Sequence, residues 1–305
     1  MRGLGVVSLV VSVLLVAAGC TGGGADPVPA ASPTTTAEPE GEVVDRAADL
    51  AAVEGTYDVR LGVYAIDTAT GDRVEHRADE RFAFASTFKA LLVGVLLEQD
   101  GMDILQQEVP VSTADLVDYA PQVEEALAQG RTSMTVAELA DATVRFSDNA
   151  AGNLLLALVG GPAGFQQALR DLGDDVTSSS RGEPELNEAV PGDVRDTTTP
   201  RAIASTLGYL TLDGAAEPAR EHLLDLMRRN TTGDAVIRAG VPAGWEVADK
   251  TGSASYGTRN DIAVVWPPGG EPIVVAILTS RDEQDAERVD AAIADAMRVV
   301  AEALA

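Results

Sequence analysis

The 305-residue sequence predicts an α/β fold of the α+β type, in which a five-stranded antiparallel sheet is flanked by helices. Two observations lead to this prediction. Strand-like runs occur near the two ends of the chain, within residues 59–74 and 245–279, whereas residues 86–229 have mainly helical patterns. The two ends would therefore form one sheet, with an all-α region inserted between its strands. Hydrophobic residues make up 46% of the chain, which is enough to fill a core of this size.

Residues 1–43 are predicted to precede the folded domain. Residues 1–19 have a short basic start and an apolar run, which is typical of a secretory signal and too short for a membrane span. The run ends in Val16-Ala17-Ala18-Gly19-Cys20, which is similar to a bacterial lipoprotein processing site, so Cys20 would become the lipidated N-terminus. A secretory leader cut nearby is the alternative. Residues 20–43 are rich in Gly, Pro, Ala, Thr and Ser and predict a flexible tether.

The folded domain is predicted to span residues 44–305, with its α/β part in residues 44–84 and 230–305 and its all-α part in residues 85–229. Strands are expected where apolar residues alternate, and helices where they recur at helical spacing. The expected strands are residues 59–65, a short run ending at 74, 245–250, 261–266 and 273–279. The expected helices are residues 45–57, 82–97, 135–145, 149–159, 164–172, 199–210, 217–230 and 285–304.

One long connection, residues 178–198, has no helical or strand period and contains Gly182, Pro184, Pro191 and Gly192. A loop of this length inside a compact domain is usually functional. We therefore expect an omega-type loop that contributes to a site.

The composition argues against several classes of protein. The formal net charge is −26 and no run of Lys and Arg occurs, so a nucleic-acid partner is disfavoured. Cys20 is the only cysteine, so no disulfide forms within the chain, and a zinc site built from His and Cys lacks ligands. The two histidines, His76 and His222, lie outside any motif and are assigned to the surface, which disfavours a Ser-His-Asp triad. The sequence implies no cofactor and no metal.

Ser86 and Lys89 are three residues apart in an apolar run, so a helix there would place them on one face, about one turn apart. An amine in apolar surroundings has a lowered pKa and can activate a neighbouring hydroxyl as a nucleophile. The alternative is a helix-capping serine and a lysine that extends to solvent. Of the 22 Lys and Arg residues, only Lys89 and Lys250 are lysines, and arginine cannot be deprotonated in a protein. Both lysines are therefore candidates for chemistry.

Four short motifs occur in this order: Ser86-Thr87-Phe88-Lys89, Ser147-Asp148-Asn149, Arg181–Asn187 in the long loop, and Lys250-Thr251-Gly252. Each is weak alone, but Ser-x-x-Lys, Ser-Asp-Asn and Lys-Thr-Gly together are the set found in class A β-lactamases and penicillin-binding proteins. The chain resembles a class A β-lactamase over about residues 45–305, and especially the secreted, actinobacterial-type enzymes of GC-rich Gram-positive bacteria. Residues 193–200, 247–252 and 256–261 also resemble the family. The resemblance implies the serine β-lactamase / D,D-peptidase fold.

The resemblance also implies a role for the polar residues of these motifs. Ser86 would attack the lactam carbonyl and become acylated, while the backbone N–H groups of Ser86 and Ser253 would form the oxyanion hole. Either Lys89, or Glu183 acting through a water, would take the serine proton. Ser147 would pass a proton to the departing ring nitrogen, with its hydroxyl tuned by both lysines of the chain. Helix capping is the alternative role for Ser147.

Glu183 separates two activities of this fold. By resemblance, Glu183 and Asn187 hold the water that releases the acyl group, Asn153 braces the loop, and an ion pair between Arg181 and Asp196 pins it. The alternatives are an exposed loop acid for Glu183 and unrelated surface charges for the pair. By the same resemblance, Lys250, Thr251, Ser253 and Arg259 are expected to bind the carboxylate of the substrate. Asn149 would bind its acylamino side chain, and Tyr119 would form an aromatic wall at the mouth of the cleft. Asn187 is also expected among the substrate-binding residues.

The predicted function is hydrolysis of the β-lactam ring of penicillins and some cephalosporins, which confers antibiotic resistance. The alternatives are a D-alanyl-D-alanine peptidase or penicillin-binding protein, and a penicillin-sensing domain of the same fold. Both keep their acyl adduct, so the Glu183 loop favours the hydrolase. The expected partners are small β-lactams, with no nucleic acid and no membrane contact apart from a lipid anchor at Cys20. We expect an exported monomer, either secreted or held on the outer face of the cell membrane.

Overall fold

The computed structural model describes residues 41–214 and 216–305. The predicted signal, the lipidation site at Cys20 and most of the predicted tether lie outside the described residues. Residues 41–43, predicted as the end of the tether, instead lie along strand β2 (Arg73–His76). Val43 forms a parallel bridge with Arg73, which also donates hydrogen bonds to the carbonyls of residues 41 and 42. The chain is therefore tied to the sheet from residue 41 onwards.

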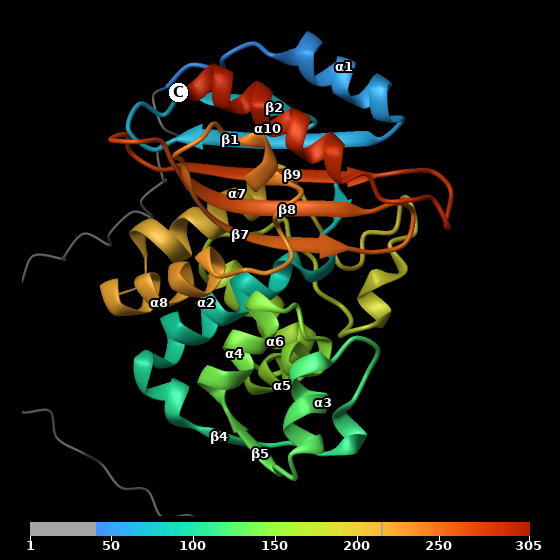
Figure 1. The fold of residues 1–305 in the computed structure, drawn as a ribbon, viewed down its shortest axis with the longest axis vertical. Coiled ribbons are helices and arrows are strands. Elements are labelled where there is room, and N and C mark those ends of the chain that lie inside the picture. Colours follow the sequence, from blue (N-terminus) through green and yellow to red (C-terminus); the bar gives the residue numbers. More distant parts are fainter. Residues whose placement is uncertain (1–40, 215) are drawn as a thin grey trace, which may run out of the picture. The chain divides into compact units, whose positions relative to one another are not determined.

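The predicted five-stranded antiparallel sheet is confirmed, and its strands come from both ends of the domain (Figure 1). The strand order is β2-β1-β9-β8-β7, and all neighbouring strands are antiparallel. Alternation along the first strand places Leu61 and Val63 in one hydrophobic core and Tyr64 in the other. The strands are β1 (Arg60–Asp67), β2 (Arg73–His76), β7 (Glu246–Ser253), β8 (Arg259–Trp266) and β9 (Ile273–Ser280).

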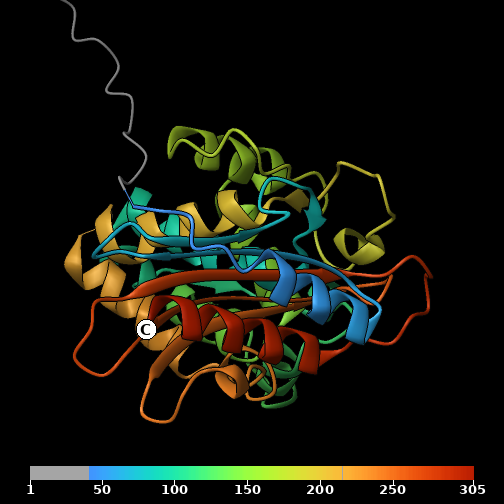
Figure 2. The same cartoon turned by 90° about the horizontal axis from the view of Figure 1, so that it is seen from above.

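Helices cover both faces of the sheet (Figures 1 and 2). They are α1 (Ala47–Tyr57), α2 (Phe88–Asp100), α3 (Pro121–Ala128), α4 (Val136–Arg145), α5 (Asn149–Leu158), α6 (Gly161–Asp171), α7 (Pro200–Gly208), α8 (Glu217–Arg228), α9 (Ile237–Gly240) and α10 (Asp290–Leu304). Helices α1 and α10 cover one face, where Leu50 and Ile293 are fully buried. Helix α7 packs on the other face, beside α2 and the remaining helices of the all-α region. Burial of apolar surface on both faces is the main favourable term for such a fold.

Helix α2 is the centre of the inserted all-α region. All its residues from Phe88 to Leu97 are buried, because α2 packs against α4, α5, α6, α7 and α8. The ring of Phe88 meets Phe165 of α6 edge-on, with centroids 5.9 Å apart. A short 3₁₀ turn, Ala85–Thr87, leads into α2 and places Ser86 at its start. Within residues 41–214 and 216–305, no helix combines the length and the apolar character needed to cross a membrane.

Several predicted boundaries were wrong. Residues 82–83, predicted as helix, form a short strand β3 (Phe82–Ala83) that pairs with β6 (Thr197–Thr198). The last helix begins at Asp290 rather than at residue 285, because the preceding Val289 keeps an extended backbone. The predicted helix 199–210 changes after Gly208 into a π turn.

Other elements were not predicted. Helix α3 begins with Pro121, and proline in the first turn is a helix-start signal that could have identified it. A 3₁₀ turn, Glu185–Glu188, interrupts the long loop. Two more 3₁₀ turns and a second strand pair complete the all-α region: Met102–Gln106, Thr113–Asp115, β4 (Glu108–Pro110) and β5 (Ser133–Thr135).

Candidate active site

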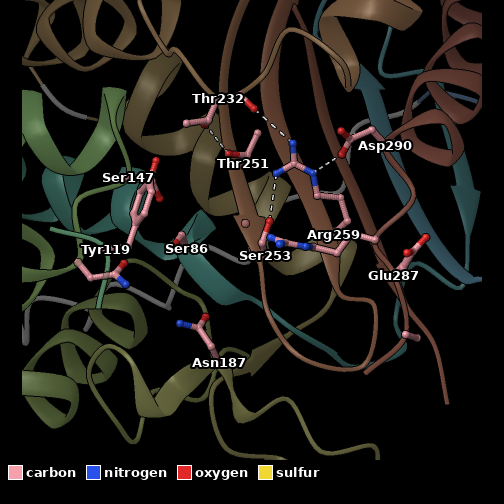
Figure 3. A pocket seen from close by; sticks show the side chains of 14 residues that line it. Ser86, Tyr119, Ser147, Asn187, Thr232, Thr251, Ser253, Arg259, Glu287 and Asp290 are labelled. Carbon is pink, nitrogen blue, oxygen red and sulfur yellow. Dashed lines mark hydrogen bonds and ion pairs between the residues drawn. The ribbon is translucent and has the colours of Figure 1, made fainter. Parts of the chain in front are cut away.

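Ser86 lines a cleft of about 880 Å³ at the end of β7 and the start of β8 (Figure 3). Ala85, directly before the serine, has a φ of 48°, which non-glycine residues rarely adopt. Tyr119, which also has a positive φ, is 61% exposed and lines the cleft, so it is not a core tyrosine. The predicted site residues that line the cleft are Ser86, Tyr119, Ser147, Asn149, Asn187, Thr251, Ser253 and Arg259.

The hydroxyl of Ser86 lies between a lysine and a glutamate. Lys89 Nζ is 2.9 Å from Ser86 Oγ, Glu183 Oε1 is 3.0 Å from the same oxygen, and Lys89 Nζ and Glu183 Oε1 are 2.9 Å apart. Ser86 Oγ therefore accepts a hydrogen bond from the ammonium and donates one to the carboxylate. Both residues predicted as proton acceptors lie within the distance that a general base requires, and Glu183, which was predicted to act through a water, contacts Ser86 Oγ directly.

The Lys89 side chain is completely buried. Its ammonium also donates to the backbone carbonyl of Ser147 at 3.0 Å and to Oδ1 of Asn149 at 2.5 Å. Burial lowers the pKa of Lys89, and the charge of Glu183 opposes this shift. Because a buried ammonium needs a partner for each of its protons, Lys89 holds α2, the Ser147–Asn149 turn and the long loop in register.

Ser147 has a positive φ of 59°, and its hydroxyl accepts a hydrogen bond from Lys250 Nζ at 3.1 Å. Lys250 also donates to the carbonyl of Thr251 at 2.9 Å. We predicted that both lysines would tune the Ser147 hydroxyl, but Lys89 contacts the carbonyl of this residue instead. Lys250 is completely buried, and burial, reinforced by the positive charge of Lys89, lowers its pKa to about 7.

Asp148 supports this turn, a role that was not predicted from the sequence. Its fully buried carboxylate accepts from the amide of Ala151, which caps α5, and from the amides of residues 122–123 at the start of α3. One side chain therefore joins two helix N-termini and positions Ser147 and Asn149 on either side of itself. An aspartate directly before an apolar helical run is an N-cap signal that could have predicted this role.

Glu183, in the long loop, is held by hydrogen bonds to the neighbouring helix α5 and to another residue of the loop. Asn153 of α5 accepts from the Glu183 amide at 2.8 Å and donates to its carbonyl at 2.7 Å, while Asn187 donates to Oε2. Glu183 is only 3% exposed, so the alternative of an exposed loop acid is wrong, whereas Glu185 is exposed. Gly182 permits the close approach to α5, because a Cβ there would lie 2.8 Å from Asn153 Oδ1.

The predicted ion pair between Arg181 and Asp196 is present at the two ends of this loop. Arg181 Nε lies 2.6 Å from Asp196 Oδ2, and Asp196 Oδ1 accepts from the amides of Ser180 and Arg181. Asp196 is completely buried, so these are not unrelated surface charges. Arg181 also pairs with Glu188 inside the loop. Charge-assisted hydrogen bonds therefore close the loop.

The ends of β7 and β8 supply hydrogen-bond donors to one wall of the cleft. Arg259 is fixed in three directions: Nε donates to Asp290 at 2.6 Å, Nη1 to Ser253 Oγ at 3.2 Å and Nη2 to the Thr232 carbonyl at 3.3 Å (Figure 3). Thr232 Oγ1 and Thr251 Oγ1 are 2.6 Å apart. Of the residues predicted to bind a carboxylate, Thr251, Ser253 and Arg259 line the cleft, whereas Lys250 is completely buried.

A buried polar layer behind β7 was not predicted. Asp249 points to the opposite face of the strand from Lys250, because side chains alternate, and it binds Arg238 at 2.5 Å and Asn230 at 2.6 Å. Burial raises the pKa of Asp249 and of Asp261 on β8, both of which are completely buried. The acid next to Lys250 in an otherwise apolar strand is the sequence feature that could have predicted this layer.

Neither histidine belongs to the site. His76 lies 3.2 Å from Glu54 with its side chain only 13% exposed, so its assignment to the surface was wrong. His222 is partly buried, and this burial lowers its pKa. Neither lines the cleft at Ser86. In the part of the chain that the structure describes, no three His, Cys, Asp or Glu residues are grouped to hold a metal ion.

This geometry defines a class of protein. A serine at a helix start, in contact with a buried lysine and a buried glutamate beside an open cleft, is the arrangement of a serine hydrolase that acts through an acyl-enzyme. The sequence comparisons give the family: a profile of the β-lactamase enzyme family matches residues 45–304. The chain belongs to this family, and the resemblance stated from the motifs is confirmed.

Individual relatives cover most of the chain. A β-lactamase of Bacillus licheniformis is 54% identical over 257 residues, which cover 84% of this chain and 83% of that protein. A β-lactamase of Amycolatopsis lactamdurans is 54% identical over 274 residues, covering 90% and 89% respectively. The crystal structure of a class A β-lactamase from Clostridium kluyveri DSM 555 matches with a TM-score of 0.81 at 46% identity, covering 84% of this chain and 97% of that chain.

Replacing Asp148 tests its support of the turn. We expect Asp148→Ala to lower the free energy of unfolding by about 3 kcal/mol, because buried amides at two helix starts lose their acceptor. Urea unfolding followed by circular dichroism measures the change. The exposed Asp175 provides the control, since Asp175→Ala should stay within about 0.5 kcal/mol of the parent. Equal losses in the two variants would contradict the assigned role.

Proposed function

We propose that this chain hydrolyses the β-lactam ring of penicillins and some cephalosporins, and so confers antibiotic resistance. The observation that carries the proposal is the contact of both Lys89 and Glu183 with Ser86 Oγ. The lysine can activate the nucleophile, and the buried carboxylate can serve as the base for the water that releases the product. Family membership supports the reaction, and the site geometry supports the roles of individual residues.

In the first step, Ser86 Oγ bonds to the lactam carbonyl carbon and the ring C–N bond breaks. The hydroxyl proton passes to Glu183, or to Lys89 when its lowered pKa leaves it as the neutral amine, and both groups lie within hydrogen-bond distance. The N–H groups of Ser86 and Ser253 stabilise the oxyanion, and such a donor is typically worth about 3 kcal/mol. Ser147, in contact with Lys250, gives its proton to the ring nitrogen and is reprotonated by the proton taken from Ser86.

Substrate binding is assigned to the two sides of the cleft. Thr251, Ser253 and Arg259 supply donors for the carboxylate of the substrate. Asn149 donates one amide hydrogen to the Asp118 carbonyl at 2.7 Å and keeps the second for the acylamino side chain. Tyr119 borders the mouth of the cleft.

In the second step, a water attacks the ester carbonyl carbon and its proton passes to Glu183. The bond to Ser86 Oγ then breaks, and Glu183 returns the proton to that oxygen. Asn187 donates to Glu183 Oε2, and its own Oδ1 has no partner within the described residues, so it can accept a hydrogen bond from that water. A D-alanyl-D-alanine peptidase, a penicillin-binding protein or a penicillin sensor would keep the adduct. The contact between Glu183 and Ser86 favours the hydrolase.

The central test is whether the acyl group formed from penicillin is released from Ser86. With benzylpenicillin, we expect many turnovers for the wild type and a trapped adduct on Ser86 for Glu183→Ala, with release slowed at least about 100-fold because the general base is lost. Lactam absorbance and intact mass measure the two outcomes. Glu185→Ala is the matched control, since this exposed neighbour makes no contact with the site and should turn over normally. A stable adduct on the wild type would contradict the hydrolase and indicate a peptidase or a sensor instead.

The pH dependence tests the role of Lys250. Its pKa is lowered to about 7, so its positive charge is lost as the pH rises through that value. If the charge assists anionic substrates, kcat/KM for benzylpenicillin falls above about pH 7. Arginine keeps its charge, so Lys250→Arg should remove this basic limb while retaining measurable activity. Identical pH profiles would show that the limb has another origin.

We also propose that the protein is exported and acts as a monomer with a lipid on Cys20. The signal-like residues 1–19 and the residues before the cysteine support export and lipidation. We expect the wild type in the membrane fraction and Cys20→Ser in the medium or the soluble fraction, because the anchor is lost. Activity in fractionated cells measures this. Identical distributions would favour the secretory-leader alternative.

A further inference from the structure

Arg288 differs from the other arginines of the described chain. Across residues 41–214 and 216–305, the other arginines all form hydrogen bonds, ion pairs or electrostatic contacts, whereas Arg288 has no such partner. Arg288 is exposed and lines the cleft that contains Ser86. The whole chain has 48 acidic residues against 22 basic ones, so an arginine that remains without any such partner is unusual.

The other positive charges of the cleft are already matched or buried. Arg259 Nε lies 2.6 Å from Asp290, so a carboxylate on the same wall compensates its charge. Lys89 pairs with Glu183, and Lys250 is completely buried. Of the described residues that line the cleft, Arg288 is therefore the cation with no carboxylate within ion-pair distance, although the exposed Glu287 next to it in the sequence also lines the cleft.

The backbone brings Arg288 to the same cleft as the ends of β7 and β8. Residues 286–290 lead into α10, and Ala286, Glu287, Arg288 and Asp290 all line the cleft. In Figure 3, Asp290 and Glu287 lie around Arg259, on the side away from Ser86. Arg288 lies between these two acids in the sequence, so its side chain starts from the wall assigned to the substrate carboxylate.

We infer that Arg288 is a specificity-determining residue, which favours β-lactams that carry negative rather than positive charge beside the ring carboxylate. The inference deepens the proposed function and rests on it. A protein with net charge −26 repels an anionic substrate, and a local positive charge at the binding wall offsets this repulsion. Arg259 is less able to do so, because Asp290 neutralises it. A cationic substituent next to the carboxylate would be repelled by Arg288.

The test compares wild type and Arg288→Gln on three cephalosporins that share one acyl side chain. Their substituents at position 3 are an uncharged acetoxymethyl, a cationic pyridiniummethyl and an anionic carboxylate-bearing thiomethyl group. For Arg288→Gln, we expect KM to rise about three- to fivefold for the anionic compound and to fall for the cationic one, with smaller changes in kcat, because an exposed charge contributes modest, uniform binding.

Two further variants separate charge from structure. Arg288→Lys should restore most of the preference, since it keeps the charge. Arg298, in the middle of α10, binds Asp295 and the Ala239 carbonyl and does not line the cleft. Arg298→Gln therefore makes the same change in net charge away from the cleft and should leave all three KM values unchanged. Raising the NaCl concentration should weaken the preference of wild type more than that of Arg288→Gln.

Equilibrium binding of the same compounds in a Ser86→Ala background measures the preference without turnover. Equal affinity ratios across the three compounds with and without Arg288→Gln would overturn the inference and leave the proposed hydrolysis intact. A proportional loss for all three compounds would assign Arg288 a structural role and overturn it as well. A wild type that binds with the expected preference but opens none of the rings would contradict the proposed function alone.

Discussion

The structure depends on the burial of one ammonium group, that of Lys89, inside the apolar start of α2. Removing such a charge from water costs several kcal/mol unless each of its protons meets a partner. The partners come from separate segments: the hydroxyl of Ser86, the Ser147–Asn149 turn and the carboxylate of Glu183. One electrostatic requirement therefore brings the nucleophile, the turn and the long loop together. Displacing any of them would leave a buried charge uncompensated.

Supporting carboxylates hold these segments without touching the reacting groups. Asp148 satisfies backbone amides at two helix starts, and Asp196 satisfies amides and a guanidinium where the long loop closes. Strand β7 carries a similar division, with Lys250 facing the site and Asp249 facing a buried layer with Arg238. The two-residue period of the strand separates the polar group used for chemistry from the polar group used for support.

The sheet could be predicted because strand alternation is local and strand-like runs occurred at both ends of the domain. The residues around Ser86 could be predicted because their motifs, taken in order, resemble those of class A β-lactamases. Some long-range contacts were predicted through the resemblance alone, such as the ion pair between Arg181 and Asp196, whereas others could not be predicted. The contact of Lys89 with the Ser147 carbonyl depends on a backbone turn with positive φ. The pairing of Arg259 with Asp290 joins residues 31 apart, and the start of α10 at Asp290 turns a predicted helical segment into part of the cleft wall.

The chain has only two lysines, and both side chains are completely buried. The folded domain therefore presents no lysine amine to solvent. Reagents that acylate or crosslink amines can reach Lys89 or Lys250 only when the packing around these side chains opens. Labelling at either lysine would thus record how often the domain opens, and surface attachment through lysine would select opened molecules over native ones.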